Sequence, residues 1–215
     1  MAKILIAVPT FETITPDTYK SLWDMDKGDN EIIFEYVRGY DTASARNNIA
    51  ERAQVLNTDF VMMVDSDTVV PRKALVYLLS HDVDVCMGYY MHRDKSTNAI
   101  TNKTNACRLA NADGKPYFGY PAESQMTGDE IRDLYERGQS LVQIHGGGMG
   151  CILINTRVFD LAEYPWFDWC NWPNDDHTVL SEDLYFCEQM KNEDIPIYLD
   201  TRIQCGHLMR RVEYV

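Results

Sequence analysis

The chain has 215 residues, a size that fits one large domain or two small ones. With 45% hydrophobic and 25% charged residues it has the composition of a soluble globular protein, and no apolar run approaches the ~20 residues of a membrane span. Acidic residues outnumber basic ones by 33 to 20, and the net charge of −13 disfavours broad contact with nucleic-acid backbones. The short apolar start before Pro9 predicts a first strand rather than a signal peptide, so we expect a cytoplasmic protein.

The first 91 residues alternate between strand and helix patterns. Apolar runs predict strands at 3–9, 30–39, 59–65 and 83–91, and helical spacing and caps predict helices at 15–25, 41–56 and 71–81. Such alternation is typical of an α/β fold with a mostly parallel central sheet flanked by helices. Ligands of these sheets bind at the carboxyl ends of the strands.

The rest of the chain is less regular. Residues 92–140 predict an insertion with one helix at 127–138, which begins with a capping box of Thr127 and Glu130. A glycine loop, a strand and an aromatic loop follow. A helix that begins after Ser181 then leads to two short strands, at 195–200 and 202–208.

Two carboxylates follow the strand predicted at 59–65. Asp65 and Asp67 have only Ser66 between them. Carboxylates repel each other and are costly to bury without a partner, so either water or a cation must stabilise them. Oxygen ligands favour hard ions such as Mg²⁺ or Mn²⁺, which keep positions open for substrate phosphates. The alternative is a solvated turn.

Further candidates lie near the C-terminus. Glu182 and Asp183 open a predicted helix, where acids suit the helix dipole but can also act as a general base. His207 is either structural or an imidazole ligand of the same ion. The six cysteines lack a Cys-x-x-Cys pair and predict reduced, mostly buried thiols. A zinc site of Cys170, His177, Cys205 and His207 is an alternative without an established zinc spacing.

Each of two loops allows a structural and a functional interpretation. The glycine loop at 145–150 either lets a ligand approach the backbone or forms a hinge before the next strand; it does not open a helix as a dinucleotide fingerprint does. Trp166, Trp169 and Trp172 either pack in the core or place one indole on a sugar ring. Trp172 is the candidate for stacking, because the Pro-Asn pair after it indicates a loop.

The order of these motifs resembles that of the GT-A glycosyltransferases, particularly the family 2-like enzymes that use a nucleotide-sugar donor. The resemblance runs through AVPTFETI, the segment 41–71 with its Ala-Arg-Asn start and Asp-x-Asp end, GGGMGCILINTRVF, SEDLYFCEQM and CGHL. It covers nearly the whole chain outside about 92–140. It implies a single GT-A catalytic domain over 1–215, with a nucleotide-binding half at 1–91, an insertion or lid at 92–140 and an acceptor and catalytic half at 141–215.

The resemblance also implies roles for single residues. Asp65, Asp67 and His207 would bind Mn²⁺ or Mg²⁺, and Asp183 would be the catalytic base of an inverting transfer, with Glu182 beside it. Trp172 remains the acceptor-side candidate. The residues expected to bind the donor are Pro9, Thr10, Glu12, Arg46, Asp65, Ser66, Gly147, Gly148, Arg210 and Arg211, with Arg46 near the base or the phosphates.

The implied activity is metal-dependent transfer of a sugar from a nucleotide-diphosphate sugar, with UDP favoured, to a hydroxyl. The acceptor would be a glycan or a small molecule, and the charge disfavours a nucleic acid. One alternative is a nucleotidyltransferase, which needs a glycine- and lysine-rich loop that PTFETITPD lacks. The other is a non-catalytic protein that binds nucleotide sugars. The sequence does not indicate an oligomeric state.

Overall fold

The computed structural model describes residues 1–11, 13–39, 41–94, 96–97, 99–117, 119–171 and 179–208. The helices are α1 (Pro16–Asp24), α2 (Thr42–Val55), α3 (Ala74–Leu79), α4 (Gly128–Glu136), α5 (Val158–Leu161) and α6 (Glu182–Asn192), with a 3-10 turn at Ala122–Ser124. The strands are β1 (Lys3–Thr10), β2 (Glu31–Arg38), β3 (Phe60–Val64), β4 (Thr68–Val69), β5 (Val85–Arg93), β6 (Ile100–Cys107), β7 (Gln125–Thr127), β8 (Leu141–Ile144), β9 (Gly146–Gly147), β10 (Cys151–Asn155), β11 (Cys170–Asn171), β12 (Val179–Leu180) and β13 (Ile197–His207).

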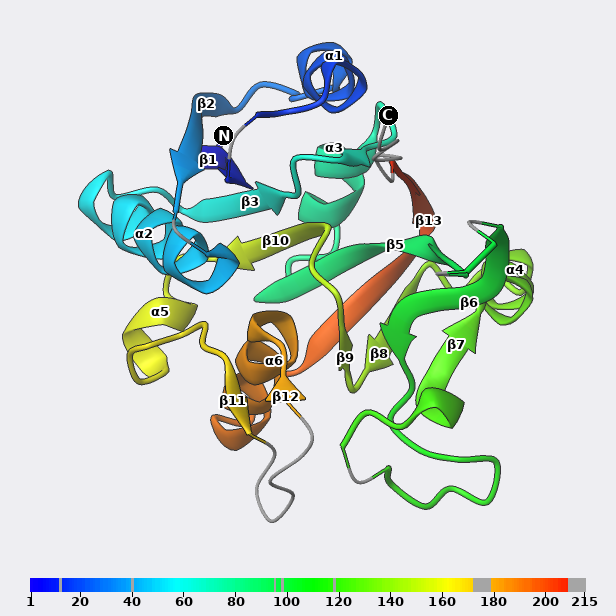
Figure 1. Cartoon of the computed structure of the whole chain (residues 1–215). Helices are drawn as coiled ribbons and strands as arrows, with labels where there is room; N and C mark the ends of the chain where they lie inside the picture. The colour runs from blue at the N-terminus through cyan, green and yellow to red at the C-terminus, as the bar shows by residue number, and fades with distance from the viewer. Residues whose placement is uncertain are drawn as a thin grey trace, which may run out of the picture.

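A central sheet with the strand order β2-β1-β3-β10-β5-β13-β4 organises the molecule (Figure 1). β1, β2, β3, β5 and β13 run in one direction, and β10 runs against its neighbours β3 and β5. The predicted α/β fold with a central sheet flanked by helices is therefore confirmed. Five of the seven strands in this order share one direction, while β10 and β4 run against them, so the sheet is mixed. No helix in the described part of the chain is long and apolar enough to cross a membrane.

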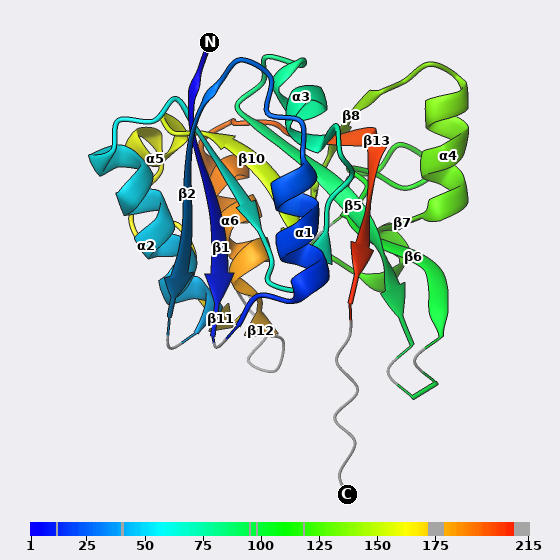
Figure 2. The ribbon, with the colours of Figure 1, turned by 90° about the horizontal axis from the view of Figure 1, so that it is seen from above.

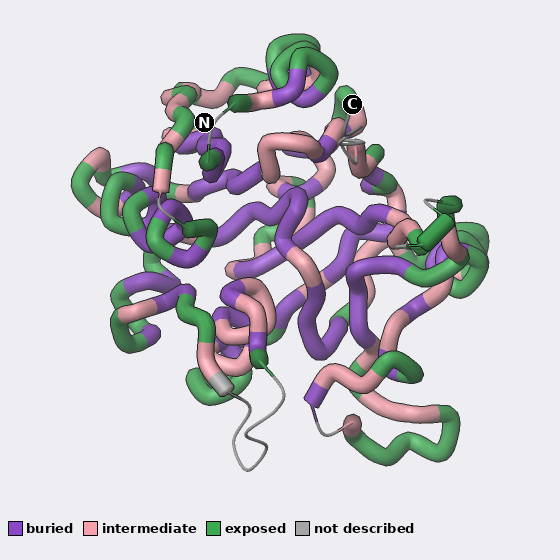
Figure 3. The backbone as a smooth tube through the Cα atoms, in the orientation of Figure 1, coloured by how far each residue is buried: buried purple, intermediate pink, exposed green. Residues whose placement is uncertain are grey.

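Helices cover both faces of the sheet because the strands bury side chains on both faces (Figure 2). Along β1, Leu5 and Ala7 join the cluster formed with α2, α5 and α6, whereas Ile4, Ile6 and Val8 join the cluster formed with α1 and α3. The central strands are buried along most of their length (Figure 3). Their ends are therefore fixed relative to one another.

Two parts of the sheet differ from the sequence-based expectation. The region expected to be an irregular insertion contains β6, which pairs antiparallel with β5, β7 and β9. The two strands expected near the C-terminus form one strand, β13, whose register against β5 shifts between Leu199 and Gln204. The helix expected at 127–138 is α4, and its capping box between Thr127 and Glu130 is present.

Helix α2 fixes the loop that leads toward α6. The Asp41 side chain caps the helix by accepting a hydrogen bond from the Ser44 N–H. One turn later, Asn47 donates through Nδ2 to the carbonyl of Phe167 at 2.7 Å. Its Oδ1 accepts from the N–H groups of Trp166 and Phe167 at 3.1 and 3.2 Å. A buried amide thus holds a segment about 120 residues away in the chain.

Asn47→Ala is expected to lower the free energy of unfolding by about 2–3 kcal/mol, because it leaves buried backbone groups without partners. Asn48→Ala is the matched control, since Asn48 is the next residue of the same helix and is exposed; it should change stability by no more than about 0.5 kcal/mol. Urea unfolding measures both values. Equal losses of stability in the two variants would contradict this role of the Asn47 side chain.

Candidate active site

A cavity of about 460 Å³ opens at the carboxyl ends of β1 and β3, where α2 begins. Four carboxylates and one imidazole line it, and no Lys or Arg does within the described residues. The cavity is therefore strongly anionic and suits a cation or a ligand that arrives with one. Its lining residues are Pro9, Thr10, Phe11, Gly39, Asp41, Thr42, Ala45, Asp65, Ser66, Asp67, Glu182 and His207.

Asp67 and His207 meet at the rim of this cavity. The end of β13 pairs with β4, which sets His207 opposite Thr68, and the Leu208 N–H donates to the Asp67 carbonyl at 2.8 Å. The His207 Nε2 atom then lies 3.6 Å from Asp67 Oδ2. The two side chains are 25% and 37% exposed, so a ligand can reach both.

Arg46 forms ion pairs with three acids, Asp65, Glu182 and Asp183. Its Nη2 atom lies 2.8 Å from Asp65 Oδ1 and 3.1 Å from Asp183 Oδ1, and its Nε atom lies 3.6 Å from Glu182 Oε1. The side chain is 1% exposed. Burial lowers the pKa of Arg46, but Asp65, Asp183 and Glu182 raise it further, so the guanidinium stays charged.

Asp183 lies between Arg46 and the glycine loop. Its Oδ2 accepts a hydrogen bond from the Met149 N–H at 3.1 Å, and its side chain is 17% exposed. Burial, with smaller contributions from Glu182 and Asp65, raises the pKa of the Asp183 carboxyl to about 7, although Arg46 opposes the rise. A carboxyl that titrates near neutrality is suited to accept a proton in catalysis.

The residues at the rim fit a divalent ion only in part. Among the described residues no group of three His, Cys, Asp or Glu side chains is arranged to hold a metal. Asp67 and His207 supply one carboxylate and one imidazole, and His207 Nδ1 is buried without a hydrogen-bond partner in that part of the chain. This donor set suits Mn²⁺ or Mg²⁺ when substrate oxygens fill the other positions. In the zinc alternative, the Cys205 thiol is buried against Cys151, and His177 lies outside the described residues.

The structure brings several of the predicted donor residues to the cavity and leaves others away from it. Pro9, Thr10 and Ser66 line the cavity. Arg46 was expected near the base or the phosphates but is enclosed by carboxylates and does not reach the cavity surface. Four predicted residues lie outside the described part of the chain, namely Glu12, Trp172, Arg210 and Arg211. Of the other two tryptophans in the aromatic loop, Trp166 is buried and Trp169 is exposed.

Protein packing accounts for the glycine loop. A Cβ atom on Gly147 would lie 2.4 Å from the Asn105 carbonyl oxygen, and one on Gly148 would lie 2.5 Å from the Tyr90 hydroxyl. A Cβ on Gly150 would lie 2.8 Å from the Tyr90 ring. Gly147, expected to bind the donor, is buried against β6, and Gly148 is half-buried. The loop therefore needs glycine so that it can pack over Tyr90 and β6.

Sequence analysis missed several residues that shape the site. Tyr90 lies under the glycine loop with its ring centre 4.6 Å from that of His207, and burial raises the pKa of its hydroxyl. Phe11 and Asp41 line the cavity, and the Met149 N–H orients Asp183. Asp41 had a visible signal as a helix cap, and Phe11 as an apolar residue after a strand. Tyr90 lies within an apolar run and carries no such signal.

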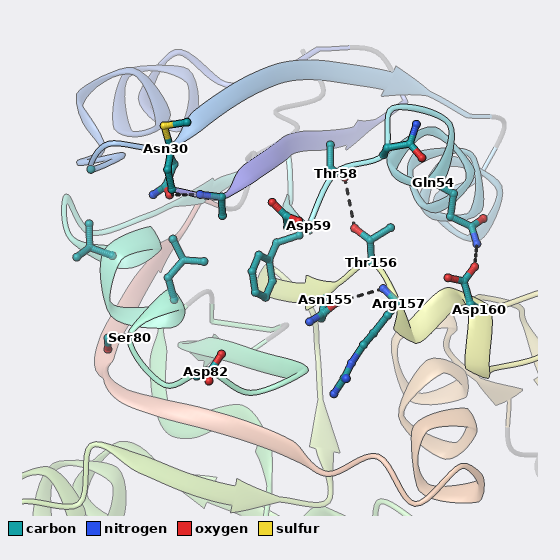
Figure 4. A pocket seen from close by; sticks show the side chains of 17 residues that line it. Asn30, Gln54, Thr58, Asp59, Ser80, Asp82, Asn155, Thr156, Arg157 and Asp160 are labelled. Carbon is teal, nitrogen blue, oxygen red and sulfur yellow. Dashed lines mark hydrogen bonds between the residues drawn. The ribbon is translucent and has the colours of Figure 1, made fainter.

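A larger hollow of about 1110 Å³ lies at the opposite end of the sheet, beside the amino ends of β1 and β3 (Figure 4). Its polar side chains mostly form hydrogen bonds with other groups of the protein. Asn30 Oδ1 accepts from the Ala2 N–H at 2.9 Å, and Gln54 donates to Asp160 at 2.7 Å. Asp59 accepts from the backbone of Lys3 at 2.7 Å. The smaller acidic cavity is therefore the candidate site, because its charged groups converge on open space.

The structure has the α/β fold that is found in the GT-A glycosyltransferases. Protein A197 from STIV has a TM-score of 0.60 and 15% identity, over 97% of this chain and 86% of that chain. GalNAc-T7, solved with UDP, GalNAc and Mn²⁺, has a TM-score of 0.59 and 11% identity, over 98% of this chain and 44% of that chain. This chain thus spans less than half of the GalNAc-T7 chain. Neither a protein-family model nor a curated protein sequence matches it.

Identities at this level establish a shared fold and no more. The central sheet and its flanking helices are those of a glycosyltransferase-like fold, as the resemblance implied. The assignment of substrate, ion and catalytic residues depends on the geometry of the site itself.

Gly148→Ala is expected to lower the free energy of unfolding by about 1–3 kcal/mol, because its Cβ meets the Tyr90 hydroxyl. Tyr90→Phe should relieve part of this loss, since the nearest ring carbon, Cζ, would be 3.5 Å away. A double-mutant cycle from urea unfolding measures the coupling. Gly147→Ala is the control, because its clash is with backbone and Tyr90→Phe should not relieve it. Strict additivity of the Gly148 and Tyr90 changes would contradict this packing.

The Asp183 carboxyl is expected to titrate near pH 7 in the ligand-free protein, observed as the ¹³C carboxyl signal that Asp183→Asn removes. Since the unfolded chain has an Asp pKa near ~3.9, the folded state binds the proton more tightly. The free energy of unfolding should therefore fall as pH rises from about 4 to about 7, and Asp183→Asn should flatten this part of the curve. Titration near pH 4 would refute the prediction.

Proposed function

We propose that the chain is a metal-dependent glycosyltransferase that moves a sugar from a nucleotide-diphosphate sugar, with UDP favoured, to an acceptor hydroxyl. The observation that supports this most directly is that an ion-binding pair at the cavity rim lies near the Asp183 carboxyl at the start of α6. Asp183 is next to the cavity-lining Glu182, although it is not itself a lining residue. Asp67 and His207 offer an ion-binding pair 3.6 Å apart. Asp183 offers a carboxyl with a pKa of about 7, held in the same cluster of charges by Arg46.

In this proposal residues 1–91 form the donor half. Pro9, Thr10 and Glu12 are assigned to the base and ribose, with Ser66 close to the ribose. The cavity surface carries acids and no Lys or Arg among the described residues, so a diphosphate would be repelled unless a cation accompanied it. Asp67 and His207 would hold Mn²⁺ or Mg²⁺, with Asp65 behind them. When bound, such an ion neutralises charge on the departing nucleoside diphosphate.

The chemical step needs a group that removes the acceptor proton. The acceptor oxygen forms a bond to the anomeric carbon while the bond from that carbon to the diphosphate oxygen breaks. The electron pair of the broken bond leaves with the nucleoside diphosphate, and the acceptor proton passes to the Asp183 carboxylate. The Met149 N–H and Arg46 orient that carboxylate at 3.1 Å each. This assignment belongs to an inverting transfer, with Glu182 as the neighbouring acid.

The acceptor is assigned to the other half of the molecule. Residues 141–215 and the insertion or lid at 92–140 would surround it, with Trp172 as a stacking surface for a glycan or small molecule. Gly148, which is half-buried, is assigned to the transferred sugar, and Gly147, first expected to bind the donor as well, supports the loop against β6. Arg210 and Arg211 are assigned to the diphosphate.

A screen of UDP- and GDP-sugars with and without Mn²⁺ tests the proposal through thermal stabilisation and release of nucleoside diphosphate. Asp67→Asn should abolish the Mn²⁺-dependent part of the stabilisation. Asp183→Asn should keep donor binding and lower turnover by about 10²–10⁴-fold, because it removes the base. Asp29→Asn, an exposed change far from the cavity, should match the wild type in both assays.

Each result has a defined meaning. Failure of every nucleotide sugar to bind or react with Mn²⁺ present would refute the proposal. Binding without turnover over a broad set of acceptors would favour a non-catalytic nucleotide-sugar-binding protein instead. Near-normal turnover by Asp183→Asn would remove Asp183 from the role of base, and the same measurement on Glu182→Gln would test its neighbour.

A further inference from the structure

Arg46 occupies a position that the proposed chemistry does not use directly. It lies in the first half of α2, and its side chain is 1% exposed. It lines no part of the acidic cavity. A guanidinium that is buried in this way acts on the substrate through the groups that it holds.

One nitrogen of Arg46 makes both of its closest contacts. Nη2 lies 2.8 Å from Asp65 Oδ1 and 3.1 Å from Asp183 Oδ1. Nη1 has no hydrogen-bond partner among the described residues, and Nε has only the 3.6 Å ion pair with Glu182. A single nitrogen thus donates a hydrogen bond to Asp65 and forms an ion pair, without a hydrogen bond, with Asp183.

The backbone of the glycine loop also binds both of these acids. The Asp65 N–H donates to the Gly150 carbonyl at 3.1 Å, while the N–H of the preceding residue, Met149, donates to Asp183 Oδ2 at 3.1 Å. The two acids are thus held by Arg46 through their side chains and by adjacent residues of one loop. Three carboxylates face one buried cation, so loss of that cation would leave them mutually repelling.

We propose that Arg46 is a positioning residue that locks the Asp65 carboxylate to the Asp183 carboxylate. This inference rests on the proposed glycosyl transfer, in which Asp65 stands on the cation side and Asp183 on the acceptor side. The lock keeps the base at a constant distance from the ion-binding edge, and hence from the leaving group. Small displacements of such groups have large effects on rate, while the donor pocket itself stays intact.

Arg46→Lys and Arg46→Gln test the lock, with Arg52→Lys and Arg52→Gln as controls. Arg52 lies on the same helix, is exposed and pairs with Glu35 on the surface. Lys keeps the charge but lacks the planar fork of Arg. We expect kcat to fall about tenfold in Arg46→Lys and about a hundredfold in Arg46→Gln, with the donor KM within about threefold of wild type. Both Arg52 variants should keep wild-type kcat and KM.

A second measurement does not depend on turnover. In the ligand-free protein at about pH 9, where the Asp183 carboxyl beside Arg46 is ionised, Asp183→Asn should raise Tm by several degrees more in the Arg46→Gln background than in the wild type. Without the cation, the folded state must hold either a repelled carboxylate or a proton that is costly to bind at that pH. If Arg46→Gln does not fold, the kinetic assay of Arg46→Lys alone tests the lock, because Lys keeps the charge and cannot replace Gln in the Tm cycle.

The outcomes separate the two proposals. A donor KM that rises in proportion to the loss of kcat/KM would place Arg46 in contact with the donor and overturn the lock. Wild-type kcat in Arg46→Lys and Arg46→Gln, or equal Tm effects of Asp183→Asn in both backgrounds, would overturn it as well. A clear Tm coupling without turnover of any nucleotide sugar would support the lock and refute glycosyl transfer.

Discussion

The burial of one guanidinium among three carboxylates is the constraint on which the rest of the site depends. A charged side chain inside a protein requires opposite charges close by, and Arg46 finds them on the turn after β3 and at the start of α6. These two segments are more than a hundred residues apart, and α2 reaches both. The same helical turn carries Asn47, which holds the 166–167 segment. The Arg-Asn pair of α2 thus joins the acids and the loop leading toward them.

Close packing of the glycine loop also positions the charged groups of the site. The glycine loop lies so near Tyr90 and β6 that side chains at Gly147, Gly148 and Gly150 would collide with protein atoms. As a result, the Met149 N–H and the Gly150 carbonyl stand where they hold Asp183 and Asp65. The carboxyl with a pKa near neutrality is therefore placed by the backbone of one loop and a buried cation from a helix. A site built in this way is organised before any ligand arrives.

Local patterns in the sequence predicted much of the fold, because each is decided within a few residues. The strand before Asp65, the helix that begins after Asp41 and the capping box at Thr127 belong to this kind. β6 was missed because its polar sequence, ITNKTNAC, lacks apolar alternation, and its pairing with β5 depends on the tertiary structure. Likewise, the Asp-x-Asp pair and His207 were visible as residue types, but the partners of Arg46 were not. Contacts between positions 46, 65 and 183 are set by how strands and helices pack, which no short window of sequence contains.

The irregular stretch of β13 decides which way the end of the chain faces. Before it, Ile197 and Leu199 pack with the α6 side of the core; after it, Ile203 and Cys205 pack with the α3 side. Against β5, the pairing changes from Leu199 opposite Met87 to Gln204 opposite Tyr89, so β13 carries three more residues than its neighbour. An odd number of extra residues reverses the alternation of a strand. The His207 side chain therefore lies on the same face of the sheet as that of Cys205. An even number of extra residues would turn its imidazole to the other face, away from Asp67 and Tyr90.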